Sequence, residues 1–377
     1  MRRAATAIIA IALILTTLGI IMLASTSSVK AEHDYNDPAY FLKRQMVSMV
    51  IAFIAGLFCM RIPYNYWRSL APLVGVVVLI MLVMVLIPSI GIELNGSRRW
   101  LRFGPFNLQP SELAKFALII GLARWLSQSQ RQIQTLKSGL IIPLAIIGVF
   151  ALLIFVEPDF GSTMLIGAAG LGMMFVAGTR ISYLAFAAVT AGAGLTVAIM
   201  ENEVRMRRIL AFLNPDKYAQ NEAFQLLQAI YAFVEGGLTG VGLGGSLQKR
   251  FYLPEAHTDF ILAILGEELG LFASLFVVIL FAAFFFLGIF ISYHAHDIYG
   301  RLVAFGITVM MCVQAAINIG VVTGVLPTKG LALPFISYGG TSLIVSFAMI
   351  GVLVNVAFRS AELAKAGVVT GDRTLRV

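Results

Sequence analysis

Long apolar segments alternate with short polar ones along almost the whole chain. Each apolar segment is continuous and about 20 residues long, the length that crosses a hydrocarbon core as a helix. Backbone polar groups cannot stay unpaired in lipid, so these segments predict helices and exclude a β-barrel. We predict a single all-α polytopic membrane domain over residues 1–377, with ten spans at 6–25, 43–60, 70–88, 112–126, 138–156, 160–178, 182–200, 261–292, 302–325 and 338–358.

The ends of the chain and its longest polar segment follow from this pattern. Ala4–Ala24 is longer than the core of a signal peptide, so the first span is expected to be an uncleaved anchor. Ten spans place both termini on one side, with residues 201–258 as a large outer loop and 359–377 as a polar inner tail. Within the outer loop, the apolar patch Phe224–Val234 predicts an interfacial or re-entrant helix.

The eighth apolar segment differs from the others in length. Residues 261–292 would measure about 48 Å as one helix, longer than a hydrocarbon core of about 30 Å. We expect it to project into water at its Asp259 end. The glycine-rich run Gly236–Gly245 before it follows no predicted strand, which excludes a nucleotide-binding loop and favours tight turns or close backbone approach.

Composition agrees with a membrane protein: 59% of residues are hydrophobic, 12% are charged and the mean hydropathy is +0.91. The net charge of +8 does not indicate nucleic acid, because the cations are divided between two membrane faces. Cys59 and Cys312 both lie in apolar segments, so the sequence predicts no disulfide framework and no zinc site.

Lysine and arginine do not settle the orientation, because the 27 cations divide almost equally between the two sides. Cations kept on the outer side suggest an anionic ligand such as pyrophosphate, which guanidinium groups bind in bidentate fashion. A solvated basic rim on lipid headgroups explains them equally well. The outer cations form two groups, Arg98, Arg99, Arg102 and Lys115, and Arg205, Arg207, Arg208, Lys249 and Arg250.

The most informative polar cluster is Pro254–Ile261, which sets Glu255, His257 and Asp259 directly before the eighth span. Ionisable side chains at a membrane edge are costly to desolvate and usually mark a substrate or ion site. Aspartate is also a preferred N-cap residue, so both a helix cap and a catalytic carboxylate remain open for Asp259 from the residues alone.

Four sequence blocks resemble the signature blocks of the SEDS family, whose members polymerise peptidoglycan from lipid II. They occur in the family's order and cover nearly the whole chain. Three short segments are more similar to the division branch of the family than to its elongation branch. They are Gly242–Ser246, Leu326–Gly330 and, within one of the four blocks, Glu255–His257. The four blocks are Gln109–Lys115, Glu157–Gly161, Tyr252–Phe260 and Ile336–Gly340.

The resemblance implies an inverting glycosyl transfer with Asp259 as general base. It also implies that Lys115, with Gln109, binds phosphate or sugar and that Asp159 lies in the same cavity. The remaining candidates are expected to bind substrate (Arg98, Arg99, Glu255, His257, Lys329 and Ser337) or to tune the base (Glu267 and Glu268).

Structural explanations stand beside these roles. Lys115 could snorkel outward or pair with Glu112, and Asp159 could be only a helix cap. Glu267 and Glu268 could lie on an exposed helix end. Gln314 and Asn318, four residues apart in the ninth span, favour hydrogen bonds between helices over substrate binding.

The expected partners are lipid II, the growing glycan strand, a class B penicillin-binding transpeptidase and other division proteins, at the septum of the bacterial cytoplasmic membrane. The termini are expected in the cytoplasm and the active site outside it. No metal site has a recognisable ligand spacing, although a divalent cation such as Mg²⁺ could bridge pyrophosphate to a carboxylate. The alternatives are a lipid II flippase, or the same polymerase in cell elongation; no internal repeat indicates a transporter.

Overall fold

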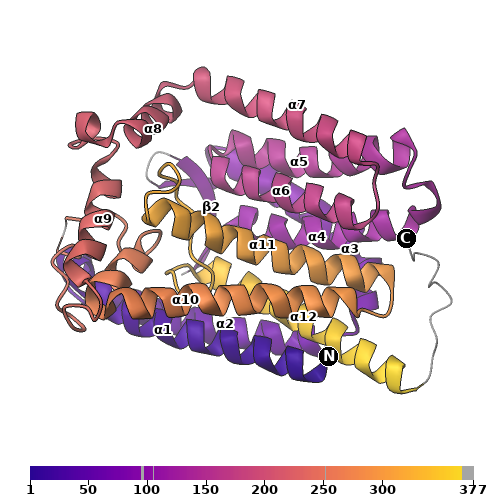
Figure 1. The fold of residues 1–377 in the computed structure, drawn as a ribbon, viewed down its shortest axis with the longest axis horizontal. Coiled ribbons are helices and arrows are strands. Elements are labelled where there is room, and N and C mark those ends of the chain that lie inside the picture. Colours follow the sequence, from indigo (N-terminus) through magenta and orange to yellow (C-terminus); the bar gives the residue numbers. More distant parts are fainter. Residues whose placement is uncertain (95–96, 105, 251, 367–377) are drawn as a thin grey trace.

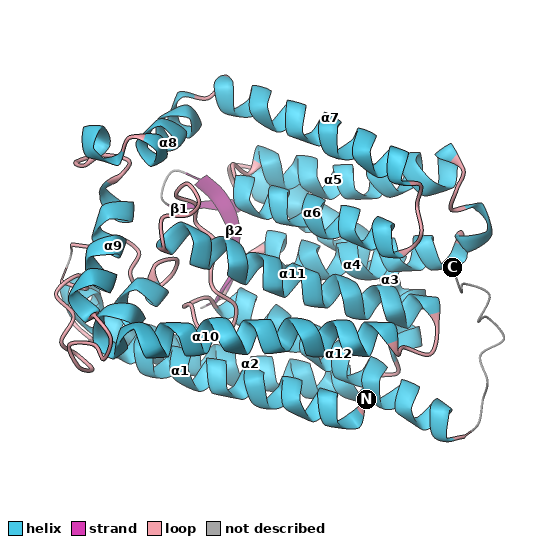
Figure 2. Ribbon diagram, viewed as in Figure 1, coloured by secondary structure: helices cyan, strands magenta, loops and turns pink. Residues whose placement is uncertain are grey.

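Long helices lie side by side along one axis in the computed structural model, which describes all residues except 95–96, 105, 251 and 367–377 (Figure 1). A short sheet and several small helices gather at one end of this bundle (Figure 2). The α-helices are α1 (Arg2–Tyr35), α2 (Tyr40–Arg61), α3 (Tyr64–Leu86), α4 (Pro110–Gln128), α5 (Ile142–Val156), α6 (Phe160–Val176), α7 (Ile181–Met200), α8 (Glu203–Leu213), α9 (Phe224–Gly236), α10 (Ile261–Tyr293), α11 (Ile298–Val322) and α12 (Gly340–Lys365). Shorter elements are η1 (Gln130–Gln132), η2 (Lys137–Ile141), η3 (Pro215–Tyr218), β1 (Gly91–Leu94), β2 (Ser97–Phe103) and β3 (Phe106–Leu108).

A helix lies over each of the ten predicted ranges, and the helical polytopic fold is confirmed. Among the described residues, eight helical segments are long and apolar enough to cross a membrane. The other two are α6, which is apolar but shorter, and α4, which carries Glu112, Lys115 and Arg124. Glu112 and Lys115 are buried among other helices and do not face lipid, whereas Arg124, near the end of α4, is half-buried.

The prediction of a purely helical chain missed the three-stranded antiparallel sheet between α3 and α4. Its register pairs Ile92 with Trp100 and Leu101 with Leu108. The segment lies outside the predicted membrane spans. There, hydrogen bonds between neighbouring strands satisfy the backbone N–H and C=O groups as well as a helix does. Successive side chains of a strand point to opposite faces, so the adjacent residues Arg98 and Arg99 are sent in different directions.

The α10 segment is not one straight helix, contrary to the prediction of a continuous projection. Gly270 has φ 79° and ψ −174°, which breaks the helix. Residues 261–268 are buried rather than in water. The amides of Leu271 and Phe272 donate to the carbonyls of Gly237 and Leu238, at 3.0 and 3.4 Å, instead of to the preceding turn.

The glycine-rich run also donates hydrogen bonds to the α10 carbonyls that this break leaves without a partner in the helix. The amide of Val241 donates to the carbonyl of Glu267 at 2.9 Å, and that of Gly242 donates to Glu268 at 3.0 Å. A Cβ at residue 240 would collide with the backbone of Glu268. The predicted close backbone approach therefore exists, and it is made to α10.

Glu267 and Glu268 are fully buried and not on an exposed helix end. The Glu267 carboxylate accepts from the Ser246 hydroxyl and, at 2.8 Å, from the Leu247 amide. Glu268 forms an ion pair of 2.8 Å with Lys249 and accepts from Ser25 of α1 at 2.7 Å. Both carboxylates thus hold the loop before the predicted base onto α10 and α1.

The outer loop is largely helical. The predicted Phe224–Val234 helix is α9, which packs against α10. The amphipathic α8 was not predicted; the side chain of its N-cap Asn202 accepts from the amide of Arg205 at 3.1 Å. Among its described residues, α7 buries only Ala187, and Figure 1 shows it at the edge of the bundle.

The N-terminus and the end of α12 lie at one end of the bundle, and α8, α9 and the sheet lie at the other (Figure 1). The first residues of the predicted polar tail, 359–365, are helical, because α12 continues to Lys365. Its last part, residues 367–377, is outside the described residues.

We predict that Gly270→Ala destabilises the protein by about 1–3 kcal/mol, because an alanine would have to hold a strained positive φ. Its Cβ would also collide with the carbonyl oxygen of Leu238. Thermal unfolding of the purified protein would measure the effect. Gly148→Ala is the matched control, since Gly148 lies within α5 with no side-chain or loop atom near its missing Cβ. Equal melting temperatures for the two variants would contradict a role for the break in stability.

Candidate active site

Two adjoining cavities lie at the end of the bundle that carries the sheet. The first, which we call the polar chamber, has a volume of about 450 Å³. The second, the apolar chamber, has a volume of about 520 Å³ and is walled mainly by α6, α7, α8 and α11. The polar chamber is lined by Ser97, Arg99, Pro158, Asp159, Phe160, Gly161, Arg208, Gln225, Pro254, Glu255, Asp259, Phe260, Thr328, Lys329 and Gly330.

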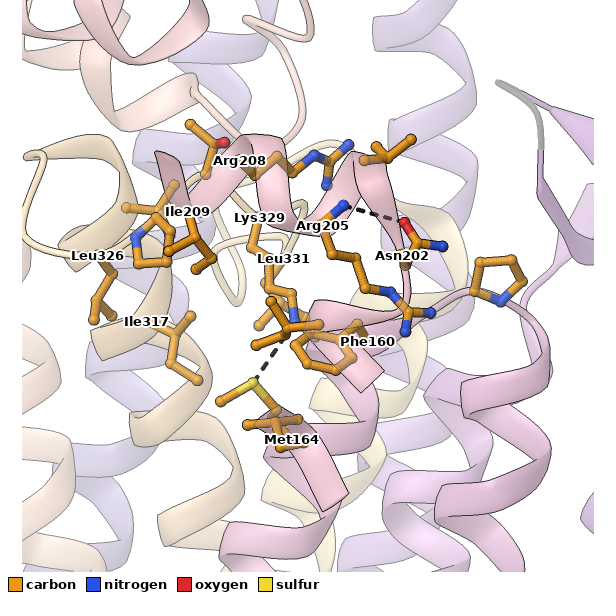
Figure 3. Close-up of a pocket in the computed structure, with 18 of the residues that line it drawn as sticks. Phe160, Met164, Asn202, Arg205, Arg208, Ile209, Ile317, Leu326, Lys329 and Leu331 are labelled. Carbon is orange, nitrogen blue, oxygen red and sulfur yellow. Dashed lines mark hydrogen bonds between the residues drawn. The ribbon is translucent and has the colours of Figure 1, made fainter. Parts of the chain in front are cut away.

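The two chambers share a wall, which we call the neck. Its cations are Arg99, Arg208 and Lys329, and Phe160 is its aromatic residue. Beyond the neck, aliphatic side chains such as Met164, Ile317 and Leu331 line the apolar chamber (Figure 3). The arrangement can hold a molecule with a polar head, a negatively charged joint and an apolar chain.

Asp259 is half-buried in the wall of the polar chamber. Burial raises the pKa of its carboxyl to about 7, and the negative charges of Glu255 and Asp159 add to the shift. Within the described residues, its side chain makes no hydrogen bond, and the N-cap of α10 is Phe260 without a side-chain cap. The helix-cap explanation of Asp259 is therefore wrong. Its carboxyl is free to exchange a proton with a ligand.

The backbone around Asp259 is fixed by side chains of α11 and of the last loop. The Asn318 amide donates to the carbonyl of Asp259 at 2.8 Å and to that of Leu331 at 2.6 Å. The Ser337 hydroxyl donates to the carbonyl of Thr258 at 2.6 Å. Ser337 thus acts on the loop and is not part of the chamber lining, and Asn318 ties two loops together rather than two helices.

Gly330 lies directly against the Asp259 carboxyl. A Cβ at position 330 would come within 2.6 Å of the Oδ2 atom of Asp259. The absence of a side chain at this position is what leaves room for the carboxyl beside the last loop.

Asp159 has both of the roles predicted for it. Its carboxylate caps α6 by accepting from the Ser162 amide at 3.1 Å and from the Ser162 hydroxyl at 2.8 Å. It also lines the polar chamber with Asp259. The cap fixes the orientation of this carboxylate, so it presents a stationary negative charge to the chamber.

Glu157 is a buried carboxyl that the sequence did not single out. Neither of its carboxyl oxygens has a hydrogen-bond partner among the described residues. Burial and the charge of Asp159 raise its pKa to about 8, against the opposing effect of Arg99. The group is therefore protonated and neutral at pH 7.

Arg99 reaches the neck from β2. Its guanidinium donates to the carbonyls of Glu157 and Pro158, at 3.0 and 2.7 Å, which holds it against the turn between α5 and α6. Arg98 points the other way and forms a 3.1 Å ion pair with the exposed Glu93. The predicted pair of substrate-binding arginines is thus divided by the alternation of the strand, and only Arg99 lines the chamber.

Lys329 lies at the neck, and its predicted contact with pyrophosphate stays a prediction. Its ammonium nitrogen is 3.4 Å from the centre of the Phe160 ring, and the Arg205 guanidinium is 5.1 Å from the same centre (Figure 3). Burial lowers the pKa of Lys329 to about 7, and the charges of Arg205, Arg208 and Arg99 lower it further while Asp159 opposes them.

Arg205 and Arg208 belong to the outer group of cations but were not chosen as site residues. Both project from α8 into the apolar chamber, and Arg208 also lines the polar one (Figure 3). The neighbouring Arg207 instead pairs with Glu203 at 3.5 Å and lies near Glu222. The amphipathic pattern of residues 203–213 was the signal that could have separated them.

Lys115 does not line either chamber. Its ammonium is buried, 2.6 Å from the Glu112 carboxylate and 2.8 Å from the amide oxygen of Gln314. The amide nitrogen of Gln314 donates in turn to the carbonyl of Ala332 at 2.7 Å. This placement favours support of the last loop, and direct binding of phosphate stays an untested prediction.

Gln109 is also outside the chamber lining. Its backbone amide donates to the Thr341 hydroxyl at 3.2 Å and its side-chain amide to that of Ser111 at 3.0 Å. It joins the start of α4 to that of α12, a connection near the site but not in it.

Glu255 and His257 have different environments. Glu255 lines the polar chamber, accepts from the Thr258 hydroxyl at 2.9 Å and lies 3.8 Å from the Lys30 ammonium. His257 is buried behind the wall against Phe41. Burial and the charge of Lys30 lower the pKa of His257 to about 4, so the imidazole is neutral near pH 7.

The chain was compared with known proteins. A family model described as cell cycle protein, covering FtsW, RodA and SpoVE, matches residues 5–362. The probable peptidoglycan glycosyltransferase FtsW of Geobacter metallireducens is 43% identical over 352 residues, which cover 93% of this chain and 94% of that protein. Stage V sporulation protein E of Bacillus subtilis is 42% identical over 351 residues, with 93% and 96% covered.

Solved structures share the fold. A chain of a peptidoglycan synthase complex that coordinates polymerization and crosslinking has a TM-score of 0.78 at 24% identity, covering 94% of this chain and 97% of that one. The rod shape determining protein RodA of Thermus thermophilus has a TM-score of 0.69 at 23% identity, with 94% and 96% covered.

The raised pKa of Glu157 predicts a pH dependence of stability. The folded state keeps this proton up to a pH of about 8, whereas an unfolded chain loses it near 4.5, so stability falls as pH rises through that window. Glu157→Gln should therefore match the wild type near pH 5 and melt at a higher temperature near pH 8. Thermal unfolding across this range would measure it. The exposed Glu201→Gln is the control, and a Glu157→Gln variant that is less stable at every pH would show that the carboxylate is paired.

Proposed function

The chain belongs to the FtsW, RodA and SpoVE family of cell cycle proteins, and from this premise we propose that it is a peptidoglycan glycosyltransferase. It polymerises lipid II into glycan strands by inverting glycosyl transfer and releases polyprenyl pyrophosphate. The observation that carries the proposal is the free carboxyl of Asp259 in a polar chamber that meets an apolar chamber at a cationic neck.

The two chambers match the two chemical halves of a lipid-linked sugar. The polar chamber suits the saccharide, and the aliphatic wall of the apolar chamber suits the first units of the polyprenyl chain. The pyrophosphate that joins them would then lie at the neck. Arginine and lysine there would meet its oxygens in charge-assisted hydrogen bonds, which are stronger than those between neutral groups.

Asp259 acts as the general base in this reaction. The acceptor 4-hydroxyl loses its proton to the carboxylate as its oxygen attacks the anomeric carbon of the donor. A carboxyl with a pKa of about 7 is well matched to this task, since it is ionised in part at neutral pH and is basic enough to hold the proton. A single displacement inverts the anomeric centre.

The cations of the neck stabilise the leaving group. Negative charge grows on the pyrophosphate oxygen as the glycosidic bond to the donor breaks, and Arg99, Arg208 and Lys329 are placed along that wall. Arg99 is held by backbone carbonyls and Lys329 rests on Phe160, so neither cation has a carboxylate partner that a pyrophosphate would have to displace.

Lys115 acts through the last loop in this proposal. Its ion pair with Glu112 orients Gln314, which holds the carbonyl of Ala332 close to Lys329 in the chain. Loss of the Lys115 charge would therefore weaken donor use through a displaced loop. A direct contact between the Lys115 ammonium and the donor phosphate, as predicted from the sequence, would be a second way for Lys115 to affect donor use.

Both chambers lie at the end of the bundle opposite the N-terminus (Figure 1). We place this end outside the cytoplasm and the termini inside. A reaction confined to one face suits a polymerase, whereas a flippase needs access from both faces. A class B penicillin-binding transpeptidase is the proposed partner, because one neighbour in fold belongs to a complex that coordinates polymerization and crosslinking.

Cell division at the septum is the proposed setting, with other division proteins as further partners. The FtsW name of relatives above 40% identity supports division over elongation. The similarity to a sporulation protein at 42% identity is compatible with the same chemistry in a third setting.

Asp259→Asn and Asp259→Ala are expected to lower glycan polymerisation by at least about 100-fold, the usual contribution of a positioned general base. Labelled lipid II, the purified variants and the partner transpeptidase would measure it, with the melting temperature as a check on folding. Asp216→Asn, an exposed change in the same outer loop, is the control. Undiminished polymer from both Asp259 variants would remove this residue as the base. A wild-type protein that translocates lipid II in vesicles without polymerising it would favour the flippase instead.

The pH dependence of the rate should separate Asp259 from Lys329. We predict a maximum of kcat/KM near pH 7, because the base needs to be ionised and the cation protonated, and both pKa values lie at about 7. Lys329→Arg keeps its charge at high pH, so it should flatten the alkaline limb and leave the acid limb in place. The exposed Lys43→Arg is the control. An unchanged alkaline limb in Lys329→Arg would contradict the role of Lys329.

A further inference from the structure

A second group of polar side chains lies at the other end of the bundle. Trp67 and Arg68 come from α3, Arg124 from α4 and Tyr299 from α11; we call them the inner cluster. Tyr299 is 19 residues before Asn318 on α11, about 28 Å along the helix from the residue that holds Asp259. The inner cluster is therefore separate from the chambers.

Tyr299 is buried, with 1% of its surface exposed, and its hydroxyl has no hydrogen-bond partner among the described residues. Its ring lies parallel to that of Tyr64, with 6.3 Å between the ring centres. The nearby Asp297 makes no hydrogen bond to it: the Oδ1 atom of Asp297 accepts from the Tyr64 hydroxyl at 2.7 Å and from the Gly300 amide. A buried polar group without a partner is costly and rare.

The groups around Tyr299 are also donors. The Arg68 guanidinium lies 5.9 Å from the centre of the Tyr299 ring, and the indole nitrogen of Trp67 is buried without a partner in the described part of the chain. The Arg124 guanidinium donates to the backbone carbonyl of Arg68. In the described residues neither arginine has an ion pair, so the inner cluster has two positive charges and unused donors, and the nearby Asp297 carboxylate makes no hydrogen bond to any of its members.

We propose that the inner cluster binds the phosphate group of an anionic membrane lipid. Guanidinium, indole and phenol donors suit phosphate oxygens, and basic pockets between helices at a membrane border are known to take lipid headgroups. Arg68 and Arg124 are half-buried, which leaves the cluster open to a ligand from outside the bundle.

The surface beside the inner cluster favours a lipid over a soluble phosphate. The face of α3 that follows Arg68 is apolar and exposed, with Leu73 at 62% and Ile80 at 54% exposure. An acyl chain can lie along this face while its phosphate contacts the arginines. Such a lipid would join α3, α4 and α11, and this proposal does not depend on the reaction at the chambers.

The test uses the full chain in nanodiscs of phosphatidylcholine, with or without phosphatidylglycerol, and compares wild type with Arg68→Gln and Tyr299→Phe. Phosphatidylglycerol should raise the wild-type melting temperature by on the order of a few degrees. The rise should be at least halved in both variants. Arg61→Gln, which removes an exposed cation from the same end of the bundle, is the control and should keep the full rise.

Tyr299→Phe separates a lost ligand from a damaged fold. In phosphatidylcholine alone it should melt at the same temperature as wild type or higher, because it removes an unpaired buried hydroxyl. An equal phosphatidylglycerol effect in all proteins would overturn the site. A rise produced by inorganic phosphate in phosphatidylcholine nanodiscs would overturn the lipid as its ligand.

Discussion

A backbone N–H or C=O group that leaves a helix within a membrane protein needs another partner, and this requirement organises the end of the molecule that carries the two chambers. The break at Gly270 frees such groups, and the glycine-rich run before α10 accepts and donates in their place. Before the start of α10, the side-chain amide of Asn318 satisfies the carbonyl of Asp259 together with that of Leu331. The loops that shape the polar chamber are thus held by side chains that bond to their carbonyls, and the glycine-rich run is held to α10 by backbone hydrogen bonds.

The same burial sets the charge of the site. Desolvation raises the pKa values of Glu157 and Asp259 and lowers that of Lys329, so all three groups titrate closer to neutrality than their free forms. Of the cations of the neck, Lys329 contacts an aromatic ring and Arg99 donates to carbonyl oxygens, and neither forms an ion pair with a described carboxylate. A neck built in this way keeps the positive charge that an anionic donor needs, because no ion pair with a described carboxylate neutralises it.

The sequence predicts the helices well, since the length and continuity of an apolar segment are local properties. It also brings Asp259 and Asp159 to one cavity through the family blocks. The break at Gly270 was missed because residues 261–292 were interpreted as one apolar run although Glu267, Glu268 and Gly270 interrupt it, and the contacts with a distant loop that fix the break are not visible in the sequence. The pairing of Lys115 with Glu112 is local and was predicted as the structural alternative, whereas its second partner, Gln314, lies 199 residues away in sequence and was not predicted. A sequence pattern does not give the direction of a side chain whose hydrogen-bond partner is far away in the sequence.

The alternation of β2 has a consequence for the evolution of this segment. Arg99 reaches the neck and Arg98 faces solvent only because the strand has its present register, with one irregularity between Ile92 and Glu93. A single inserted or deleted residue before Arg99 would exchange the two arginines between the faces. Loops on a protein surface usually tolerate changes of length, whereas a change of one residue in this hairpin would move Arg99 away from the neck.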